Sequence, residues 1–328
     1  MRIVMMGTGR FAEPTFEALL HSRHKVVGLV ANPDRPSGRE REIVRAIKKI
    51  ALAHQVPVFQ PERINTPEAI AGLKAFAPDL LVVAAYGQIL APEVLAVARY
   101  GGINVHASLL PKYRGAAPVA WAIYHGETRT GVTIIRMSPQ MDAGDILAQE
   151  QVEILPDETA GELEARLAVI GARLALQVID QIESGQVRAI PQDPSQATRA
   201  PKLKKEHGLI DWSRSASQVV NQIRAMQPWP TAYTFWHRRD KPSLRLILRQ
   251  ARALPDVTDT GAAVVSPPWV PRPGTIVTVR PDAVHVASGS GMVQLLRVQP
   301  AGGKVMSIEE FLRGHRMQVG DWLGAENP

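Results

Sequence analysis

The sequence predicts an α/β fold in which a mostly parallel, helix-flanked sheet domain precedes a small β-barrel domain. The length of 328 residues favours two domains. Apolar runs alternate with helical patterns in the first half, which is typical of a parallel sheet covered by helices. The second half carries short β-like runs separated by turn residues, which suits a small barrel. We therefore expect a first domain over residues 1–187, a linker over 188–205 and a second domain over 206–328.

The strands of the first domain are predicted from runs of apolar or β-branched residues, because a strand buried on both faces need not alternate. They are Arg2–Met6, Lys25–Ala31, Val56–Phe59, Asp79–Ala85, Gly102–His106 and Gly131–Met137, the last alternating with a period of two. Helices are predicted from apolar residues on one helical face and from Pro at a permitted first position. They are Ala12–Ser22, Glu42–His54, Thr66–Phe76, Pro92–Ala98, Pro118–His125 and Gly161–Glu183.

The second half begins after a segment rich in Pro, Gln, Ser and Lys, which we interpret as the linker. A helix is predicted over Ala216–Ala225, and a long polar, proline-rich insertion over Pro255–Pro273. Strands are predicted over Leu244–Leu248, Thr275–Val279, Ala283–Val286 and Val293–Val298.

Composition excludes several classes of site. The chain has no cysteine, which rules out disulfides, thiolate metal ligands and a cysteine nucleophile, and fits a reducing compartment. It shows no secretory pattern, and no apolar run approaches the length that spans a bilayer. The nine histidines show no metal-ligand spacing. We therefore expect a cytoplasmic protein without a metal ion and without membrane contact.

Charge is unevenly distributed along the chain. Residues 1–198 carry 20 Lys and Arg against 21 Asp and Glu, whereas residues 199–328 carry 18 against 10, a net charge of +8. A neutral half followed by a basic half suggests that the second domain binds a polyanion. Aromatic residues interleave with its basic residues, which suits RNA, although we expect Trp229 to pack in the domain core. Three lysines begin the basic part: Lys202, Lys204 and Lys205.

The stretch Gly7–Ala12 matches the pattern G-x-G-x-x-A that opens many dinucleotide sites. Such a site needs a carboxylate at the end of the second strand to hold the ribose. The sequence has Ala31 and Asn32 there. We therefore favour a glycine turn between the first strand and the first helix, and keep a nicotinamide-dependent oxidoreductase as an alternative of a different class.

An amide, an imidazole and a carboxylate form the strongest candidate site. Asn104 and His106 share one face at the carboxyl end of a predicted strand, where ligands bind in open α/β sheets. Asp142 follows in a Met-Asp-Ala-Gly-Asp turn. When an amine attacks a formyl carbon, an amide and an imidazole can stabilise the oxygen that becomes negative, and a carboxylate can assist proton removal. A turn-capping Asn and a satisfied buried His are the plain alternative.

The next loop, Ser108-Leu109-Leu110-Pro111, has the features of a binding loop for a planar heterocycle. We expect main-chain hydrogen bonds and apolar contacts to hold the ligand there. The complete string resembles the signature of the folate-dependent formyltransferase superfamily, and the likeness covers nearly the whole chain. Its motifs here are Asn104–His106, Ser108–Pro111, Arg114–Pro118, Gly131–Thr133 and Met141–Ile146.

The resemblance implies a Rossmann-like first domain, an OB-like second domain and 10-formyltetrahydrofolate as the formyl donor, without a metal. It implies that the catalytic residues are Asn104, His106 and Asp142, and that the folate site is lined by Ser108, Leu109, Leu110 and Pro111. Other stretches resemble superfamily members that formylate a charged tRNA: Pro33–Arg39, Ile210–Trp212, Pro228–Pro230, Gln299–Lys304 and Phe311–His315.

This second likeness implies a monomer that formylates the α-amine of initiator methionyl-tRNA for translation initiation, and tRNA contacts at Arg39, Lys202, Lys204 and Lys205. Two departures stand out. Gly9-Arg10 replaces the usual Pro-Asp, and Glu40-Arg41-Glu42 follows Arg39 where Gly-Lys-Lys is expected. Two alternatives keep the chemistry: an amino sugar nucleotide as acceptor, or hydrolysis of formyltetrahydrofolate. A non-catalytic RNA-binding module would not need the three site residues.

Overall fold

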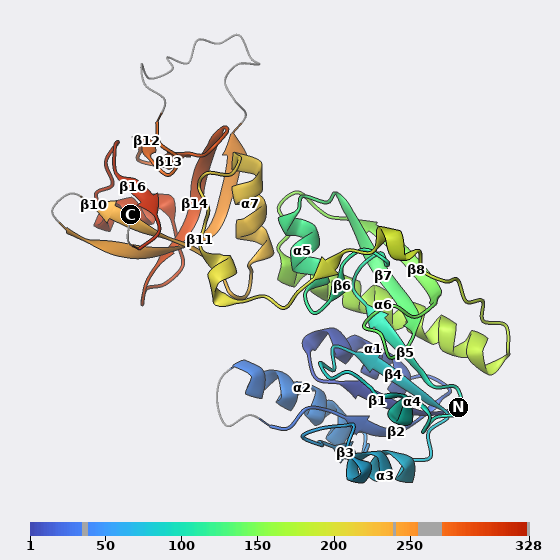
Figure 1. Cartoon of the computed structure of the whole chain (residues 1–328). Helices are drawn as coiled ribbons and strands as arrows, with labels where there is room; N and C mark the ends of the chain where they lie inside the picture. Colours follow the sequence, from blue (N-terminus) through green and yellow to red (C-terminus); the bar gives the residue numbers. More distant parts are fainter. Residues whose placement is uncertain (35–38, 239–240, 255–270, 327–328) are drawn as a thin grey trace. The chain divides into compact units, whose positions relative to one another are not determined.

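The computed structural model describes residues 1–34, 39–238, 241–254 and 271–326, without the side chains of 39–45 and 241. The chain packs into two compact units (Figure 1). Unit 1 consists of Met1–Val119, Arg129–Ile154 and Glu162–Lys202. Unit 2 consists of Ala120–Thr128, Leu155–Gly161 and Leu203–Pro328. Residues 255–270 of the predicted insertion lie outside the described part.

Unit 1 is built on a seven-stranded sheet with the order β3-β2-β1-β4-β5-β7-β8. The five strands from β3 to β5 are parallel, and β7 and β8 are antiparallel to their neighbours. The predicted mostly parallel sheet is thus confirmed. The strands are β1 (Arg2–Gly7), β2 (Lys25–Val30), β3 (Val58–Phe59), β4 (Leu80–Ala84), β5 (Gly102–His106), β7 (Arg129–Arg136) and β8 (Ile146–Glu153).

Strand β8 was not expected from the sequence. Its residues alternate between more and less exposed positions and include Glu150 and Glu153, so no apolar run marks it. It forms the edge of the sheet, where it pairs with β7, and its first residue, Ile146, also forms a single bridge with Ile190. This edge position explains why one of its faces stays polar. The charged edge follows from this position, because edge strands commonly carry charged side chains.

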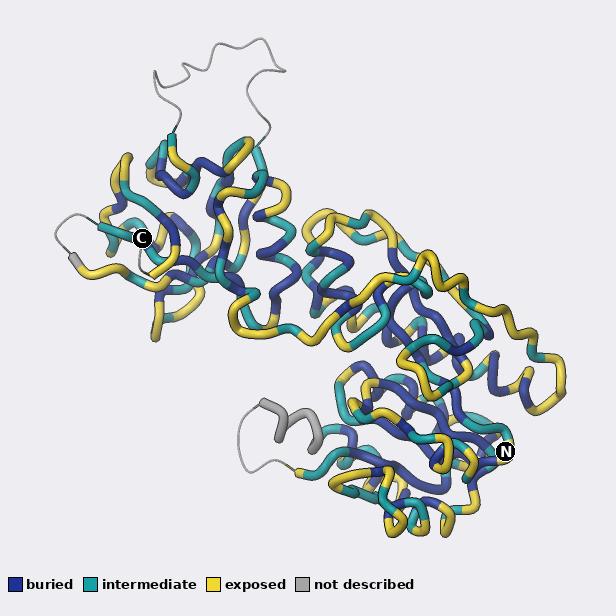
Figure 2. Tube along the Cα trace, in the orientation of Figure 1, coloured by how far each residue is buried: buried dark blue, intermediate teal, exposed yellow. Residues whose placement is uncertain are grey.

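Helices cover the sheet of unit 1. They are η1 (Arg10–Ala12), α1 (Glu13–Leu20), α2 (Arg39–Ala53), α3 (Pro67–Ala75), α4 (Pro92–Leu95) and α6 (Ala160–Glu183). Helix α3 begins as its sequence predicts, because the Thr66 side chain accepts a hydrogen bond from the amide of Ala69. Between β1, β4 and these helices lies a fully buried core that includes Val4, Leu73 and Val94, seen as dark tube in Figure 2.

Helix α6 packs against the strands that carry the candidate site. At Gly171 it approaches β5 so closely that an added Cβ would lie 2.7 Å from a methyl group of Val105. Since successive side chains of a strand point to opposite faces, Asn104 and His106 point away from α6. The packing of α6 against one face of β5 therefore leaves the two polar side chains on the other face.

Unit 2 contains an antiparallel sheet with the order β12-β13-β14-β11-β10-β16. A bridge between Thr275 and Trp322 joins the two ends of this order, so the sheet curls into the small barrel that the sequence predicts. The elements are α5 (Pro118–Tyr124), α7 (Ala216–Ala225), β10 (Ala232–Arg238), β11 (Lys241–Leu254), β12 (Ile276–Arg280), β13 (Ala283–Ala287), β14 (Met292–Pro300), β15 (Met306–Ser307), α8 (Ile308–Gly314) and β16 (Trp322–Gly324).

Two local features explain where helix α7 begins and why residues 155–161 belong to unit 2. Helix α7 begins in a capping box, in which the Ser215 hydroxyl accepts from the amide of Gln218 and the Gln218 side chain accepts from the amide of Ser215. The guanidinium of Arg224, near the end of α7, donates to the carbonyl oxygens of Leu155 and Glu158 at 3.1 and 3.2 Å. These bonds attach the segment 155–161 to unit 2.

The aromatic residues of unit 2 differ from expectation at one position. Trp236 is fully buried and donates its indole N–H to the carboxylate of Asp321 at 2.9 Å, as a core tryptophan should. Trp229 is 43% exposed, so the expectation that it packs in the core is wrong. Prolines on both sides hold it outside the regular strands that would have buried it. None of the helices in the described ranges combines the length and apolarity needed to cross a membrane.

Candidate active site

Strand β5 places the amide and the imidazole of the candidate site. It lies between parallel β4 and antiparallel β7, with Asn104 opposite Val83 on one side and Ile135 on the other. Asn104 is half-buried, and His106, the last residue of the strand, is 5% exposed. Both side chains are therefore held by a central strand and screened from bulk water.

The turn between β7 and β8 brings the carboxylate to the same place. Asn104 donates its side-chain N–H to Oδ1 of Asp142 at 3.3 Å, and Nδ1 of His106 lies 3.7 Å from Oδ2. The Asp142 side chain is 13% exposed. The structure thus brings together the three residues that the sequence singled out, and the polar interactions between them act in a partly desolvated site.

The hydrogen bond of His106 on its other ring nitrogen defines its tautomer. Nε2 lies 2.9 Å from the carbonyl oxygen of Tyr113. A carbonyl oxygen only accepts hydrogen bonds, so Nε2 carries a hydrogen. Nδ1, which faces Asp142, is then the nitrogen that can gain or lose a proton.

Sequence reasoning missed two groups that hold Asp142. The backbone amide of Gly115 donates to Oδ2 of Asp142 at 2.8 Å. The side-chain amide of Gln192 donates to the carbonyl oxygens of Asp142 and Gly144 at 2.9 and 2.7 Å. Gly115 stood within a recognised motif, so it could have been found, whereas nothing in the sequence around Gln192 pointed to the site.

The loop Ser108–Pro111 lies immediately after β5, with Ser108 and Leu110 buried and Leu109 and Pro111 half-buried. Several of its backbone groups have partners within the protein. The hydroxyl of Thr133 donates to the carbonyl oxygen of Ser108 at 2.6 Å and accepts from the amide of Leu110 at 3.1 Å. These bonds fix the loop and leave Leu109 and Pro111 as its more accessible side chains.

The hydrogen bonds and close contacts of this cluster involve none of the lysines expected to contact tRNA. Lys202, Lys204 and Lys205 are exposed. The backbone amide of Lys204 donates to Nδ1 of His207 at 3.0 Å, which orders the chain at this point. Arg39 begins α2, but its side chain lies outside the described part of the structure, as do residues 35–38 of the adjoining stretch.

The turn after β1 offers little support for a nicotinamide site. An added Cβ at Gly7 would lie 2.6 Å from Cβ of Ala12 and 2.7 Å from the carbonyl oxygen of Ala84. Asn32 stands just beyond β2, and its side chain donates to the carbonyl oxygen of Tyr86 at 2.8 Å. Close packing accounts for the glycine, and the ribose-binding carboxylate is missing from the end of β2.

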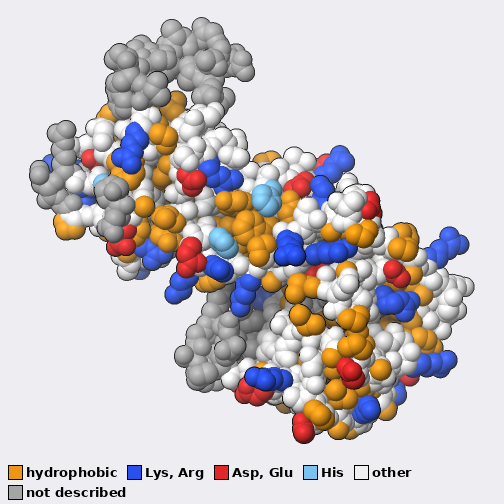
Figure 3. All heavy atoms as spheres, in the orientation of Figure 1, with side chains coloured by type: hydrophobic (Ala, Val, Ile, Leu, Met, Phe, Trp, Pro, Cys, Tyr) orange, Lys and Arg blue, Asp and Glu red, His pale blue; other side chains and the backbone are white. Residues whose placement is uncertain are grey.

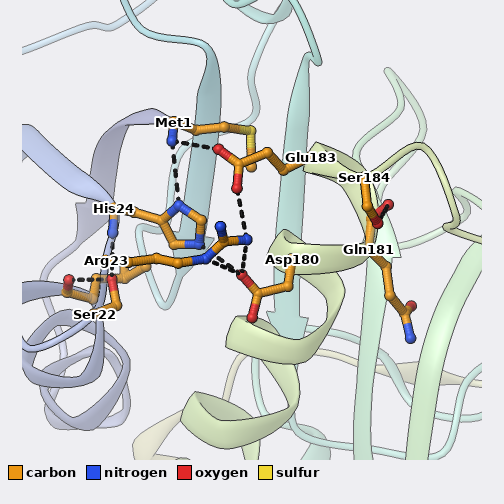
Figure 4. Close-up of polar contacts among 9 residues, drawn as sticks. Met1, Ser22, Arg23, His24, Asp180, Gln181, Glu183 and Ser184 are labelled. Atoms are coloured by element: carbon orange, nitrogen blue, oxygen red, sulfur yellow. Dashed lines mark hydrogen bonds and ion pairs between the residues drawn. The ribbon is translucent and has the colours of Figure 1, made fainter.

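One group of side chains has the spacing of metal ligands. His24, Asp180 and Glu183 offer atoms within 4.8 Å of one another. Cationic groups already contact them (Figure 4): Arg23 lies 2.7 Å from both carboxylates, and the α-amino group of Met1 lies 2.8 Å from Glu183. This arrangement is an ion-pair cluster that ties β1 and β2 to the end of α6, and its carboxylates already have the positive partners that a metal would supply.

Comparison with known proteins identifies the family of the chain. The formyl transferase family model matches residues 1–179, and the model of the formyl transferase C-terminal domain matches residues 202–316. The methionyl-tRNA formyltransferase of Alkaliphilus oremlandii is 41% identical over 325 residues, 99% of this chain and 100% of that protein. Those of Bacillus subtilis and Acidithiobacillus ferrooxidans are 40% and 44% identical, over 99% and 98% of this chain and 98% of each relative.

Solved structures with the same fold include other formyl transferases. WlaRD, a sugar 3N-formyl transferase determined in the presence of dTDP and 5-N-formyl-THF, superposes with a TM-score of 0.64 at 15% identity, covering 90% of this chain and 97% of that one. HypX from Aquifex aeolicus, in complex with tetrahydrofolic acid, gives 0.59 at 17%, covering 95% and 47%. At these identities the likeness concerns the fold. From the two family models and the full-length relatives, the chain belongs to the formyl transferase family and carries both of that family's domains.

Proposed function

We propose that this protein transfers the formyl group of 10-formyltetrahydrofolate to the α-amine of initiator methionyl-tRNA, giving formylmethionyl-tRNA for translation initiation. The observation that carries the proposal is the convergence of Asn104, His106 and Asp142 at one end of β5, with 3.3 Å and 3.7 Å between the polar atoms. The relatives that match over their full length carry this activity in their names. Amide, imidazole and carboxylate together serve an amine's attack on a formyl carbon.

Asn104 and His106 act on the formyl oxygen. The Asn104 side chain donates one N–H to Asp142 and has a second N–H for a substrate oxygen. His106 keeps its Nε2 hydrogen on Tyr113, so it reaches the formyl oxygen through a protonated Nδ1. Two such donors, fixed before the reaction, stabilise the charge that develops as the C–N bond forms.

Asp142 handles the proton that the amine must lose. Oδ2 of its carboxylate lies 3.7 Å from Nδ1 of His106. The same carboxylate, directly or through water, accepts the proton that leaves the attacking nitrogen. That proton then passes to the folate nitrogen from which the formyl group departs, so the enzyme ends in its starting state.

The donor supplies a one-carbon unit at the formyl level, and the loop after β5 suits its ring system. We propose Ser108, Leu109, Leu110 and Pro111 as the folate-contacting residues. The backbone groups bound to Thr133 are already used, so Leu109 and Pro111 would make the main contacts through apolar surface. No metal ligand is required by this chemistry.

The acceptor tRNA would bind the basic second half. Residues 199–328 carry 18 Lys and Arg against 10 Asp and Glu, and several of the Lys and Arg side chains of unit 2 appear on the face drawn in Figure 3. We propose residues 1–187 as the catalytic domain, 188–205 as the linker and 206–328 as the OB-like tRNA-binding domain. Arg39, Lys202, Lys204 and Lys205 would contact tRNA phosphates. We further propose a monomer that acts in the cytoplasm, where charged tRNA is used.

The test is transfer of labelled formyl from the folate to methionyl-tRNA by the wild type and by Asn104→Ala, His106→Asn and Asp142→Asn. We expect turnover to fall by about 100-fold or more in each variant, since removal of one oxyanion donor costs that much elsewhere. Asp282→Asn, at an exposed position between β12 and β13, is the matched control and should keep full turnover. Unchanged turnover in Asp142→Asn would refute the mechanism.

The same assay separates the alternatives. An amino sugar nucleotide and water are offered in place of methionyl-tRNA, and free tetrahydrofolate is measured in each case. Faster formylation of the sugar, or release of formate at the same rate without an acceptor, would replace the proposed acceptor. Free methionine should not be formylated, because it lacks the phosphates through which the basic half would bind the acceptor.

A further inference from the structure

Gln192 lies in the segment that follows α6, and it contacts both sides of the candidate active site. We propose that Gln192 is a positioning residue that holds the carboxylate of Asp142 in the orientation needed for catalysis. The rate of catalysis then depends on the position of the segment that carries Gln192. The inference rests on the proposed function, because it takes Asp142 as the residue that handles the proton. It adds a residue outside every motif that identified the site.

The side-chain amide of Gln192 uses all its hydrogen-bonding capacity. Nε2 donates to the carbonyl oxygens of Asp142 and Gly144 at 2.9 and 2.7 Å. Oε1 accepts from Nε and Nη2 of Arg114 at 3.1 and 2.7 Å. Two donors and two acceptor positions are all that this side chain has. The opposite orientation of the amide would place its NH₂ group against a guanidinium and its oxygen against two carbonyl oxygens, so the geometry is unique.

The turn that carries Asp142 needs such support. Asp142 has φ of 49°, a left-handed conformation that most residues with a side chain avoid. Gly144 leaves no room for a side chain, because an added Cβ would collide with the carbonyl oxygen of Arg136. Gln192 binds the carbonyl groups at both ends of this turn and therefore fixes the direction of the Asp142 side chain.

Gln192 also fixes the group that donates to Asp142. The guanidinium bound to Gln192 belongs to Arg114, and the next amide, that of Gly115, donates to Oδ2 of Asp142 at 2.8 Å. The Gln192 side chain thus supports the Asp142 carboxylate in two ways. It binds the backbone carbonyl of Asp142, and through Arg114 it holds the chain whose next amide, that of Gly115, donates to the carboxylate. Loss of Gln192 removes one support from the backbone at Asp142 and one from the chain at Gly115.

The same segment is attached to the site at further points. Ile190 forms a bridge with Ile146 at the start of β8. The amide of Tyr113 donates to the hydroxyl of Thr198 at 2.8 Å, and β9 (Arg199–Ala200) pairs with β6 (Arg114–Gly115). The carbonyl group of Tyr113 in turn holds His106. Both His106 and Asp142 are therefore positioned by the segment that leads along the chain into the basic half.

The experiment compares Gln192→Ala and Gln192→Glu with Gln196→Ala. Gln196 lies in the same segment, is exposed and contacts the carboxylate of Asp193, so it is the matched control. We expect kcat to fall about 10- to 100-fold in both Gln192 variants, because small misplacements of catalytic groups have effects of this size. KM for the folate and for methionyl-tRNA should stay within about threefold, because the hydrogen-bond partners of Gln192 are Arg114, Asp142 and Gly144. None of these is among the residues proposed to contact the folate or the tRNA. Gln196→Ala should match the wild type in every parameter.

A spectroscopic signature separates positioning from a general loss of structure. The ¹⁵N resonances of the His106 ring should move in the Gln192 variants and stay in place in Gln196→Ala, since the ring senses the Asp142 carboxylate. Gln192→Glu keeps the contact with Arg114 and the volume of the side chain, so it tests the proposal even if Gln192→Ala does not fold. Wild-type kcat with unchanged His106 resonances in Gln192→Glu would overturn the proposal.

Asp142→Asn is assayed in parallel to distinguish failure of the proposed mechanism from failure of the positioning role of Gln192. Full activity in Asp142→Asn would refute the proposed mechanism and with it this inference. An inactive Asp142→Asn together with a fully active Gln192→Glu would leave the proposed function standing and refute the positioning role alone. Loss of activity in both, with folded protein and unchanged KM, supports both.

Discussion

The Nε2 atom of His106 lies 2.9 Å from the carbonyl oxygen of Tyr113. This distance decides which nitrogen does chemistry, because the bond to an acceptor keeps a hydrogen on Nε2 in every protonation state. The chemistry of the ring is then confined to Nδ1, on the side of Asp142.

The first prediction follows from this bond. In protein labelled with ¹⁵N-histidine, the ring of His106 should show a hydrogen on Nε2 throughout a pH titration, and the exchange of a proton should be confined to Nδ1. His106→Asn identifies the resonance by its disappearance. A neutral ring with its hydrogen on Nδ1 would contradict both the tautomer and the route by which His106 reaches the formyl oxygen.

The second prediction concerns the hydroxyl that fixes the loop after β5. Thr133→Val keeps the shape of the side chain but removes the partner of the Ser108 carbonyl oxygen and the Leu110 amide. Leaving buried polar groups without partners should lower the free energy of unfolding by about 1–3 kcal/mol. KM for the folate should rise, since Leu109 and Pro111 lose their fixed positions, while KM for methionyl-tRNA should not. Denaturant unfolding and steady-state kinetics measure the two effects.

Thr15→Val is the matched control for this substitution. Thr15 is 1% exposed, and its hydroxyl has no hydrogen-bond partner among the described residues. Removing that hydroxyl should leave the stability unchanged or increase it, because no bond is lost. Equal destabilisation by both substitutions would mean that valine is poorly accommodated in general and that the Thr133 hydroxyl has no special part in the loop.

The parts of the fold that sequence could predict are those with strong local patterns. The run at Leu80–Ala84 is apolar because this parallel strand is buried on both faces, so its position is evident from the sequence. Strand β8 escaped because an edge strand with Glu150 and Glu153 has no such pattern. Trp229 was placed in the core wrongly, because an aromatic residue indicates burial only on average and the prolines around it decide its exposure.

The candidate site divides in the same way. Asn104 and His106 are two positions apart on one strand, so their common direction follows from local geometry. The position of Asp142 depends on the turn between β7 and β8, which the motif resemblance brought into view. Gln192 is far from Asp142 in the sequence and contacts it through a backbone carbonyl group. Only folding reveals such a contact, because a glutamine in a polar segment carries no signal of its own.

The third prediction concerns the ion pair between Arg23 and Asp180, at 2.7 Å. The hydrogen bond from Arg23 lowers the pKa of the Asp180 carboxyl below its ordinary value. A carboxyl whose pKa is lower in the folded state stabilises the protein above its unfolded-state pKa and loses this effect as the pH falls through the folded-state pKa. Asp180→Asn should therefore reduce stability slightly at pH 7, and this loss should diminish as the pH falls towards about 2, below the ordinary pKa of an aspartate.

Urea unfolding at the two pH values tests this prediction. Arg23→Gln removes the partner, and the double variant Arg23→Gln, Asp180→Asn shows whether the two losses are shared. The coupling free energy between Arg23 and Asp180 should be small, because both side chains are exposed and water screens their charges. A coupling that is as large at pH 2 as at pH 7 would show that packing, rather than charge, links the two residues.

The fourth prediction tests whether the basic residues at the start of the second half bind phosphate. Lys204→Ala with Lys205→Ala should weaken the binding of tRNA. The slope of log K against log salt should become shallower by about 1.4 to 1.8, because each lysine that neutralises a phosphate contributes about 0.7 to 0.9. Turnover at saturating methionyl-tRNA should not change, since neither lysine belongs to the cluster of Asn104, His106 and Asp142. Lys25→Ala with Lys74→Ala removes the same charge from two exposed positions in unit 1 and is the control. If this control lowers the salt dependence equally, the tRNA senses only the net charge of the protein, and the two lysines of unit 2 form no specific contact.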